Sequence, residues 1–336
     1  MTVKQTLDWK IFTGSRGQHD GIASLPAPPP WRFSRPPKPL LLATAPKESQ
    51  EEKHRAEPFI VSDPMKLAVN AALYLRRPLL LTGKPGCGKS TLIAKVAHEL
   101  KLGRVLRWPI NSRSTVRGGV YEYDAVGRLQ SGKITDPPVE EYLTLGPLGT
   151  ALMAQNWPRA LLIDEIDKSD LDFANDLLNV IEEGEYEIPE LRRLAQKSVR
   201  VRDAYGQTET VLDGRIVCGQ FPFVVMTSNA EREFPGPFLR RCVRLTIEPP
   251  TTTQLTAIVQ SHLKQHAASV NPADIDELIQ GFDTNRRENK DVSTDQLLNA
   301  IFLTVAMPDG EARTFSSSEL EQLRANLLQP LTNTGG

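Results

Sequence analysis

An eight-residue stretch that begins at Gly83 has the residue types and the spacing of a phosphate-binding loop. It reads G-K-P-G-C-G-K-S and matches the pattern G-x-x-x-x-G-K-[ST] in full. Its three glycines let backbone N–H groups converge on phosphate oxygens without a Cβ in the way. The lysine supplies a point charge for the β- and γ-phosphates, and the serine offers a hydroxyl to Mg²⁺. The candidate nucleotide-binding residues are Gly83, Lys84, Pro85, Gly86, Cys87, Gly88, Lys89, Ser90 and Thr91.

A pair of carboxylates follows an apolar run further along the chain. Residues 160–165 read A-L-L-I-D-E, which indicates a buried strand that ends in Asp164 and Glu165. Asp164 is suited to hold Mg²⁺ through its water shell, opposite Ser90. Glu165 can orient and deprotonate a water aimed at the γ-phosphate, which favours hydrolysis over transfer to a bound acceptor. The alternative is an ordinary acidic N-cap between a strand and a helix.

Two further polar elements follow. Residues 223–229 read F-V-V-M-T-S-N, a second apolar strand that ends near Asn229. If that strand neighbours the one before the phosphate loop, Asn229 lies near the γ-phosphate and the attacking water; a turn-forming asparagine is the alternative. Arg240 and Arg241 could stabilise charge on the nucleotide of a neighbouring subunit, or could be surface charges before a strand. The sequence does not say which arginine would act.

The elements around these residues predict an α/β domain over residues 59–249. Apolar strand-like runs alternate there with helical patterns, as in a parallel sheet flanked by helices. The helix that follows the phosphate loop begins near Lys89 and points its positive end at the same anion. We therefore expect a P-loop NTPase sheet. The predicted strands are at 79–82, 104–108, 160–164, 223–227 and 243–247.

The two ends of the chain differ from this domain. Residues 1–58 are Pro-rich and predict a largely extended arm. Its aromatic residues could anchor it on a partner, or could be stray residues of a flexible linker; they are Trp9, Phe12, Trp31 and Phe33. Residues 250–330 predict a helical lid domain, and residues 331–336 a frayed tail. The predicted lid helices are at 252–266, 272–281, 293–307 and 317–328.

Composition narrows the class of protein. The chain has 336 residues, a net charge of −1 and 40% hydrophobic residues, so we expect one large or two modest globular domains. No apolar run approaches the roughly 20 residues that span a bilayer, and Met1–Lys10 lacks a signal-peptide core. Three cysteines without paired spacing indicate a reducing compartment and no zinc site. We therefore expect a cytoplasmic protein without a general attraction to nucleic acid or membrane.

The order of the motifs resembles that of AAA+ ATPases, and within them the MoxR-like, dynein-related (AAA_5) branch. The motifs that carry this resemblance are G-K-P-G-C-G-K-S (Walker A), L-L-I-D-E-I-D (Walker B), V-M-T-S-N, F-L-R-R, and the helix N-D-L-L-N-V-I-E-E-G at 175–184. The resemblance implies a five-stranded core, a helical lid, and a homo-oligomeric ring, commonly of six subunits, with ATP between subunits. It assigns Asn229 to sensor 1 and the Arg240–Arg241 pair to the trans finger. It also implies hairpin inserts within 111–138 and between Val199 and Val217.

The lid departs from the family pattern. An arginine is common near the start of one lid helix, but residues 292–297 read V-S-T-D-Q-L, with Asp295 in its place. Arg286 and Arg287 lie nearby, and no motif places them.

These residues support several functional hypotheses. The leading one is an ATP- and Mg²⁺-dependent oligomeric hydrolase that remodels or chaperones a protein partner. The second is an ATP-controlled assembly switch that signals to an effector module and turns over slowly. A small-molecule kinase is less favoured, because Glu165 and the arginine pair suit attack by water. A DNA-dependent motor is also less favoured, because the sequence has no recognisable DNA-reading module.

Overall fold

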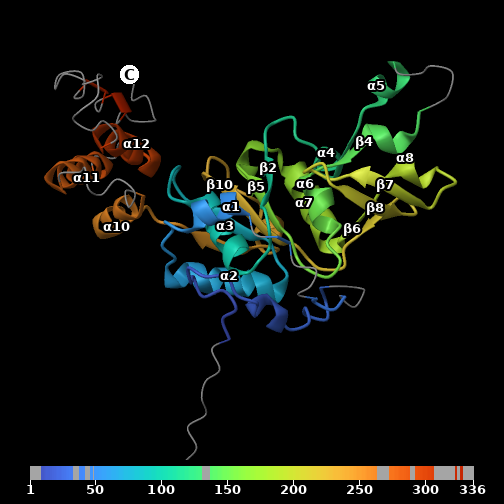
Figure 1. The fold of residues 1–336 in the computed structure, drawn as a ribbon, viewed down its shortest axis with the longest axis horizontal. Helices are drawn as coiled ribbons and strands as arrows, with labels where there is room; N and C mark the ends of the chain where they lie inside the picture. The colour runs from blue at the N-terminus through green and yellow to red at the C-terminus, as the bar shows by residue number, and fades with distance from the viewer. Residues whose placement is uncertain are drawn as a thin grey trace, which may run out of the picture. The chain divides into compact units, whose positions relative to one another are not determined.

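The computed structural model describes residues 9–32, 38–41, 46–47, 49–130, 137–262, 272–287, 292–305, 322–323 and 326–327 (Figure 1). The chain divides into two compact units. The α/β unit contains Met1–Ala56, Val61–Thr82 and Ser90–Thr246. The helical unit contains Glu57–Ile60, the phosphate loop Gly83–Lys89 and Ile247–Gly336.

A five-stranded parallel sheet forms the centre of the α/β unit. Its strands, in spatial order, are β11 (Val243–Thr246), β1 (Leu79–Thr82), β10 (Phe223–Ser228), β5 (Ala160–Asp164) and β2 (Leu106–Pro109). The sheet predicted from the sequence is therefore confirmed, with β2 beginning two residues later than expected. Because β10 lies between β1 and β5, Asn229 and Asp164 follow neighbouring strands at the same edge of the sheet.

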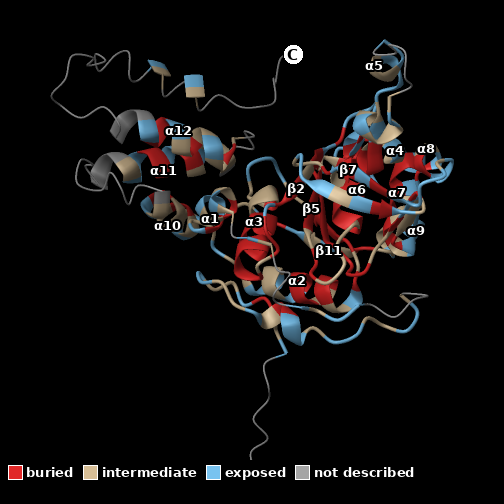
Figure 2. Cartoon of the chain, turned by 45° about the vertical axis from the view of Figure 1, so that its right-hand side comes forward, coloured by how far each residue is buried: buried red, intermediate tan, exposed pale blue. Residues whose placement is uncertain are grey.

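Helices cover this sheet because their apolar faces need burial. Leu92, Ile93 and Val96 of α3 (Lys89–Glu99) are fully buried, as are Leu177 and Leu178 of α7 (Leu171–Glu183). Figure 2 shows buried residues gathered around the sheet, α3 and α6. Further helices around this sheet are η1 (Gly21–Ser24), α1 (Gln50–Ala56), α2 (Asp63–Leu75), α6 (Pro147–Leu152), η4 (Ile166–Lys168) and α9 (Gly236–Leu239).

A second sheet of six strands extends the same unit. Its order is β3 (Tyr121–Tyr123), β4 (Leu143–Leu145), β7 (Ser198–Arg202), β8 (Thr208–Leu212), β9 (Arg215–Val217) and β6 (Glu185–Glu187). The antiparallel β7–β8 pair is the hairpin expected between Val199 and Val217. Short helices accompany the sheet: α4 (Val116–Val120), α5 (Ala125–Gln130), η3 (Val139–Tyr142) and α8 (Pro189–Arg192).

The insert expected within residues 111–138 is built differently from a simple hairpin. Its strand β3 pairs with β4, which lies beyond the expected range, and α4 and α5 flank it. The hydroxyl of Thr115 caps α4 by accepting the Gly118 N–H at 3.1 Å. This local hydrogen bond favours a helical turn where the resemblance had implied a hairpin.

The described part of the N-terminal segment packs on the α/β unit. Phe12 is fully buried, and the Asn70 side chain accepts its N–H and donates to its carbonyl oxygen. The buried Glu99 carboxylate accepts from the backbone and hydroxyl of Thr13. Trp31, in contrast, is 79% exposed. Phe33 lies outside the described residues.

Three helices form the core of the helical unit: α10 (Thr252–His262), α11 (Pro272–Arg287) and α12 (Thr294–Val305). Ser293 begins α12 with a reciprocal cap, because its N–H donates to Gln296 Oε1 at 2.7 Å and its hydroxyl accepts from the Gln296 N–H. The helix expected at 317–328 falls mostly outside the described residues, and the tail at 331–336 entirely so. Within the described ranges, no helix has the length and apolar character needed to cross a membrane.

Candidate functional site

The phosphate loop has a backbone that only glycine adopts easily. Gly83, Gly86 and Gly88 have φ values of +150°, +73° and +90°. A Cβ on Gly86 would lie 2.6 Å from Ser293 Cβ, so a larger residue is excluded by space as well as by conformation. Lys84, Pro85 and Gly86 are exposed, which leaves the rim of the loop accessible to a ligand. The loop therefore fits close approach by an anion.

Lys89 lies at the end of this loop and begins α3. The residue is buried, and its ammonium donates to the carbonyl oxygens of Gly83 at 2.6 Å and Lys84 at 2.9 Å. These contacts fold the side chain back over the loop. A phosphate bound by the loop would therefore meet the lysine charge within the same short segment.

Asp164 forms the centre of a hydrogen-bonded chain in the α/β unit. Its Oδ1 accepts from Ser90 Oγ at 3.3 Å and from Thr227 Oγ1. Thr227 Oγ1 in turn accepts the Glu165 N–H at 2.9 Å. The hydroxyl of Ser90 and the carboxylate of Asp164 are the hard oxygen ligands that Mg²⁺ prefers, so the donor set fits that ion. Both residues predicted as magnesium ligands are thus brought together.

Glu165 has an uncommon backbone for a non-glycine residue. Its φ and ψ of 59° and 47° are left-handed, a conformation that costs an L-residue roughly 1–2 kcal/mol. Its hydrogen bond to Thr227 helps hold this conformation. The carboxylate Oε2 accepts from Lys168 Nζ at 2.6 Å, and both side chains are about 40% exposed. Hydrogen bonding to Glu165 raises the pKa of Lys168.

Asn229 follows β10, and its backbone contacts the loop after β5. Its N–H donates to Asp167 Oδ2 at 2.9 Å, and the Glu231 N–H donates to the same oxygen at 3.2 Å. Ala230 between them has a left-handed φ of 61°. The structure therefore brings Asn229 beside the Asp164–Glu165 loop. Asp167 is a site residue whose role the sequence analysis missed, since the sequence showed it only as part of the acidic motif.

The two predicted finger arginines have different surroundings. Arg241 Nε donates to Glu182 Oε2 at 2.8 Å, and its Nη2 donates to Glu182 and to Asn179 Oδ1. Arg32 of the N-terminal segment donates to the other Glu182 oxygen at 2.8 Å. Burial raises the pKa of Glu182, but hydrogen bonds from Arg241 and Arg32 outweigh burial, and the pKa is lowered. Arg240 is exposed, and no described residue pairs with its side chain.

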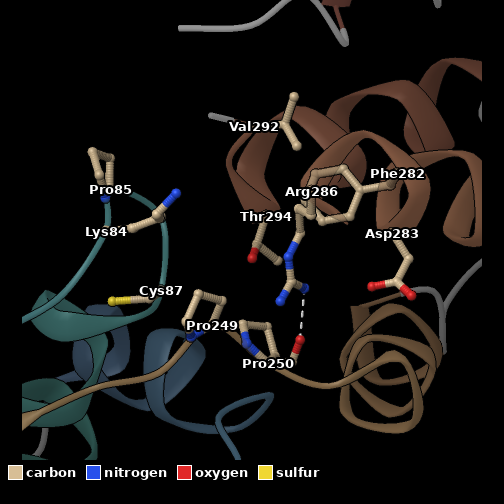
Figure 3. A pocket seen from close by; sticks show the side chains of 11 residues that line it. Lys84, Pro85, Cys87, Pro249, Pro250, Phe282, Asp283, Arg286, Val292 and Thr294 are labelled. Atoms are coloured by element: carbon tan, nitrogen blue, oxygen red, sulfur yellow. Dashed lines mark hydrogen bonds between the residues drawn. The ribbon is translucent and has the colours of Figure 1, made fainter. Parts of the chain in front are cut away.

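A cavity lies within the helical unit, between the phosphate loop and the helices (Figure 3). Figure 3 shows Arg286 of α11 donating to the Pro250 carbonyl oxygen, at 2.7 Å. Its guanidinium lies 5.9 Å from the Phe282 ring centre. The cavity is lined by Lys84, Pro85, Gly86, Cys87, Pro249, Pro250, Phe282, Asp283, Arg286, Val292 and Thr294. Arg286 is thus placed beside the loop, although no sequence motif placed it there.

Residues 78–235 match the family model described as AAA domain (dynein-related subfamily). A search of curated proteins finds no match to the chain. Among solved structures, domain III of the replication initiation protein DnaA from Thermotoga maritima is similar, with 17% identity, a TM-score of 0.43, and 82% of this chain and 96% of that chain covered. A closed-state Hsp104 complex with ATPγS and FITC casein has 16% identity and a TM-score of 0.38, with 75% and 45% covered.

The matched segment includes the phosphate loop, the Asp164–Glu165 pair and Asn229, and it ends before Arg240. Those residues lie on or directly after strands of one parallel sheet. The match to the AAA domain model therefore spans the part of the chain in which the parallel sheet brings these motif residues together.

Proposed function

We propose that the chain is a Mg²⁺-dependent ATP hydrolase of the MoxR-like branch that works as a homo-oligomeric ring, with six subunits, and remodels or chaperones a protein partner. The observation that carries the proposal is the hydrogen-bonded chain from Ser90 through Asp164 and Thr227 to Glu165. It connects Ser90, which follows the phosphate-loop lysine, to the acidic pair. Phosphate binding and activation of water can therefore take place in one site. Three free cysteines support a cytoplasmic location.

Each residue of the site has a role in this proposal. Ser90 and Asp164 would hold Mg²⁺, which when bound neutralises charge on the phosphates. Lys89 would hold the β- and γ-phosphates. Glu165 would take a proton from water as the water oxygen bonds to the γ-phosphorus and the bond to the β–γ bridging oxygen breaks. The Asn229 amide would orient that water.

Arg240 completes the site from a neighbouring subunit in this proposal. Its exposed side chain has no partner among the described residues, whereas Arg241 is bound to Glu182. An exposed arginine can reach a nucleotide across a subunit interface, and its charge stabilises a transferring phosphoryl group. Movement of the lid and inserts after loss of the γ-phosphate would then act on the protein partner.

The test uses three variants. Lys89→Ala should abolish ATP binding, and Glu165→Gln should bind ATP but lose at least about 10²-fold in turnover. Glu183→Gln is the matched control, because it removes an exposed carboxylate at the end of α7. ATP binding is measured by calorimetry and turnover by phosphate release. Wild-type turnover in Glu165→Gln would show that the base is assigned to the wrong residue.

An ATP-controlled assembly switch is a second candidate function. The specific observation in its favour is the Lys168 contact, which occupies one oxygen of the Glu165 carboxylate. A base held in an ion pair favours slow turnover. Turnover per subunit, measured against protein concentration, separates the two functions: a rate that rises with assembly and responds to a protein substrate supports the remodelling motor. A slow rate, with an oligomer that follows ATP occupancy, supports the switch.

A further inference from the structure

Asp167 is a buried carboxylate that the proposed chemistry does not use. It lies in η4, two residues after Glu165, and is 4% exposed. Its Oδ2 accepts the N–H groups of Asn229 at 2.9 Å and Glu231 at 3.2 Å. Its Oδ1 has no hydrogen-bond partner among the described residues.

The hydrogen bonds of this carboxylate must offset the free-energy cost of its burial. No described cation forms an ion pair with Asp167, and a buried charge is strongly disfavoured unless hydrogen bonds compensate it. Here the compensation comes from two backbone N–H groups, and both belong to the loop after β10. Hydrogen bonds to an ionised acceptor are stronger than neutral ones. The position of that loop is therefore coupled to Asp167.

Both loops at this contact contain a left-handed residue other than glycine. These are Glu165 after β5 and Ala230 after β10, with φ values of 59° and 61°. A second link joins the same loops, because Arg232 Nη1 donates to the Ser169 carbonyl oxygen at 2.6 Å. Such conformations persist only where surrounding contacts determine them. Loss of the Asp167 contacts would let the Asn229 backbone relax.

We propose that Asp167 is a positioning residue that fixes the Asn229 backbone, so that the Asn229 amide is held beside the water activated by Glu165. The inference rests on the proposed function, since Asp167 acts on turnover only through Asn229. Asp167 itself touches neither the nucleotide nor the water in this account. Its effect should therefore appear in kcat and not in ATP affinity.

A double-mutant cycle in the full-length chain tests this inference. The variants are Asp167→Ala, Asn229→Ala and the double variant, with kcat measured by phosphate release and the Kd of ATP by calorimetry. Asp167→Ala should lower kcat by about 10- to 100-fold, as small displacements of a positioned group do, and should leave the Kd within about twofold. In the Asn229→Ala background the same substitution should have no further effect on kcat.

Asp167→Asn provides the rescue. Its side-chain carbonyl oxygen can accept the same two N–H groups, so kcat should recover to within about threefold of the wild type. Failure to recover would overturn the proposal, because hydrogen-bond geometry would then not be what Asp167 supplies. If thermal unfolding shows that Asp167→Ala does not fold, Asp167→Val replaces it, since valine fills similar space and accepts no hydrogen bond.

Failure of this inference and failure of the proposed function give different results. If Asn229→Ala leaves kcat unchanged, the role proposed for Asn229 is wrong, and this inference falls with it. If Asn229→Ala lowers kcat but the losses multiply in the double variant, Asp167 acts independently of Asn229. That second result overturns the positioning role alone and leaves the proposed hydrolase in place.

Discussion

Glu182 binds the guanidinium of Arg241 through both Nε and Nη2. Arg32 occupies the other oxygen of the same carboxylate, so two arginines that lie far apart in the sequence share one acid at the end of α7. This arrangement assigns Arg241 to holding the segment before β11 against α7, where Arg32 also binds. It leaves the neighbouring Arg240 as the arginine whose side chain is accessible to a second molecule.

The first prediction separates these two arginines. Arg240→Ala should lower kcat on the order of 10³-fold with folding stability unchanged, because it removes the charge that we propose completes a neighbouring site. Arg241→Ala should instead lower the free energy of unfolding by about 1–3 kcal/mol, because it breaks hydrogen bonds to a partly buried carboxylate. Phosphate release and urea unfolding measure the two effects. The opposite pattern would assign the finger to Arg241.

Mixing two inactive variants tests whether Arg240 acts across an interface. Arg240→Ala subunits keep their own Glu165, and Glu165→Gln subunits keep Arg240. Mixed oligomers should therefore regain turnover, since an intact site forms wherever the two kinds of subunit meet in the right order. Absence of any regained turnover in verified mixed oligomers would place Arg240 outside the trans role.

The second prediction concerns the Ser90 hydroxyl. Ser90→Ala should raise the Mg²⁺ concentration needed for half-maximal turnover by about 10- to 100-fold, because it removes one of the two protein oxygens proposed as ligands. ATP binding in the presence of a metal chelator should not change, since the phosphate loop stays intact. A Mg²⁺ titration of phosphate release gives the first quantity and calorimetry the second. An unchanged titration would contradict the assigned ligand.

Local patterns in the sequence predicted much of this fold. The run at 160–164 is apolar and ends in two acids, and β5 has those bounds. The phosphate loop was predictable because eight consecutive residues contain both the glycines that its backbone conformation requires and the lysine that binds phosphate. The five-stranded sheet followed from the alternation of such runs with helical patterns. In each case the signal lies within a short segment.

The features that sequence reasoning missed depend on long-range contacts. The buried Phe12 is held by Asn70, 58 residues away, whose side chain binds both the N–H and the carbonyl oxygen of Phe12. The choice between Arg240 and Arg241 depends on Glu182, 59 residues before Arg241. Arg286 lines the cavity beside the loop from an α11 longer than predicted. No periodicity or motif contains such pairings, since they arise only when the elements pack.

The third prediction concerns Arg286. Arg286→Gln should weaken ATP binding by about tenfold and leave adenosine binding unchanged, because the guanidinium lines the same cavity as the phosphate loop and would meet the charge of a triphosphate. Arg202→Gln is the control, since it removes one exposed arginine of β7. Competition binding with a fluorescent nucleotide measures both affinities. Equal loss for ATP and adenosine would indicate a role in shaping the cavity instead.

The last prediction concerns the ion pair between Lys168 and Glu165. Because this pair occupies Oε2 of the proposed base, Lys168→Ala should raise turnover in the absence of any partner protein. Both side chains are exposed and solvent screens their attraction, so the expected increase is small, about two- to fivefold at most. The pKa of Lys168 is raised by its hydrogen bond to Glu165, so the ammonium stays charged through neutral pH and is lost only as pH rises through that raised pKa. The increase should therefore be the same between about pH 7 and pH 9. Lys197→Ala is the control, because it removes an exposed lysine that pairs with Asp213 and not with the proposed base. A fall in turnover in Lys168→Ala would mean that Lys168 orients the base and does not restrain it.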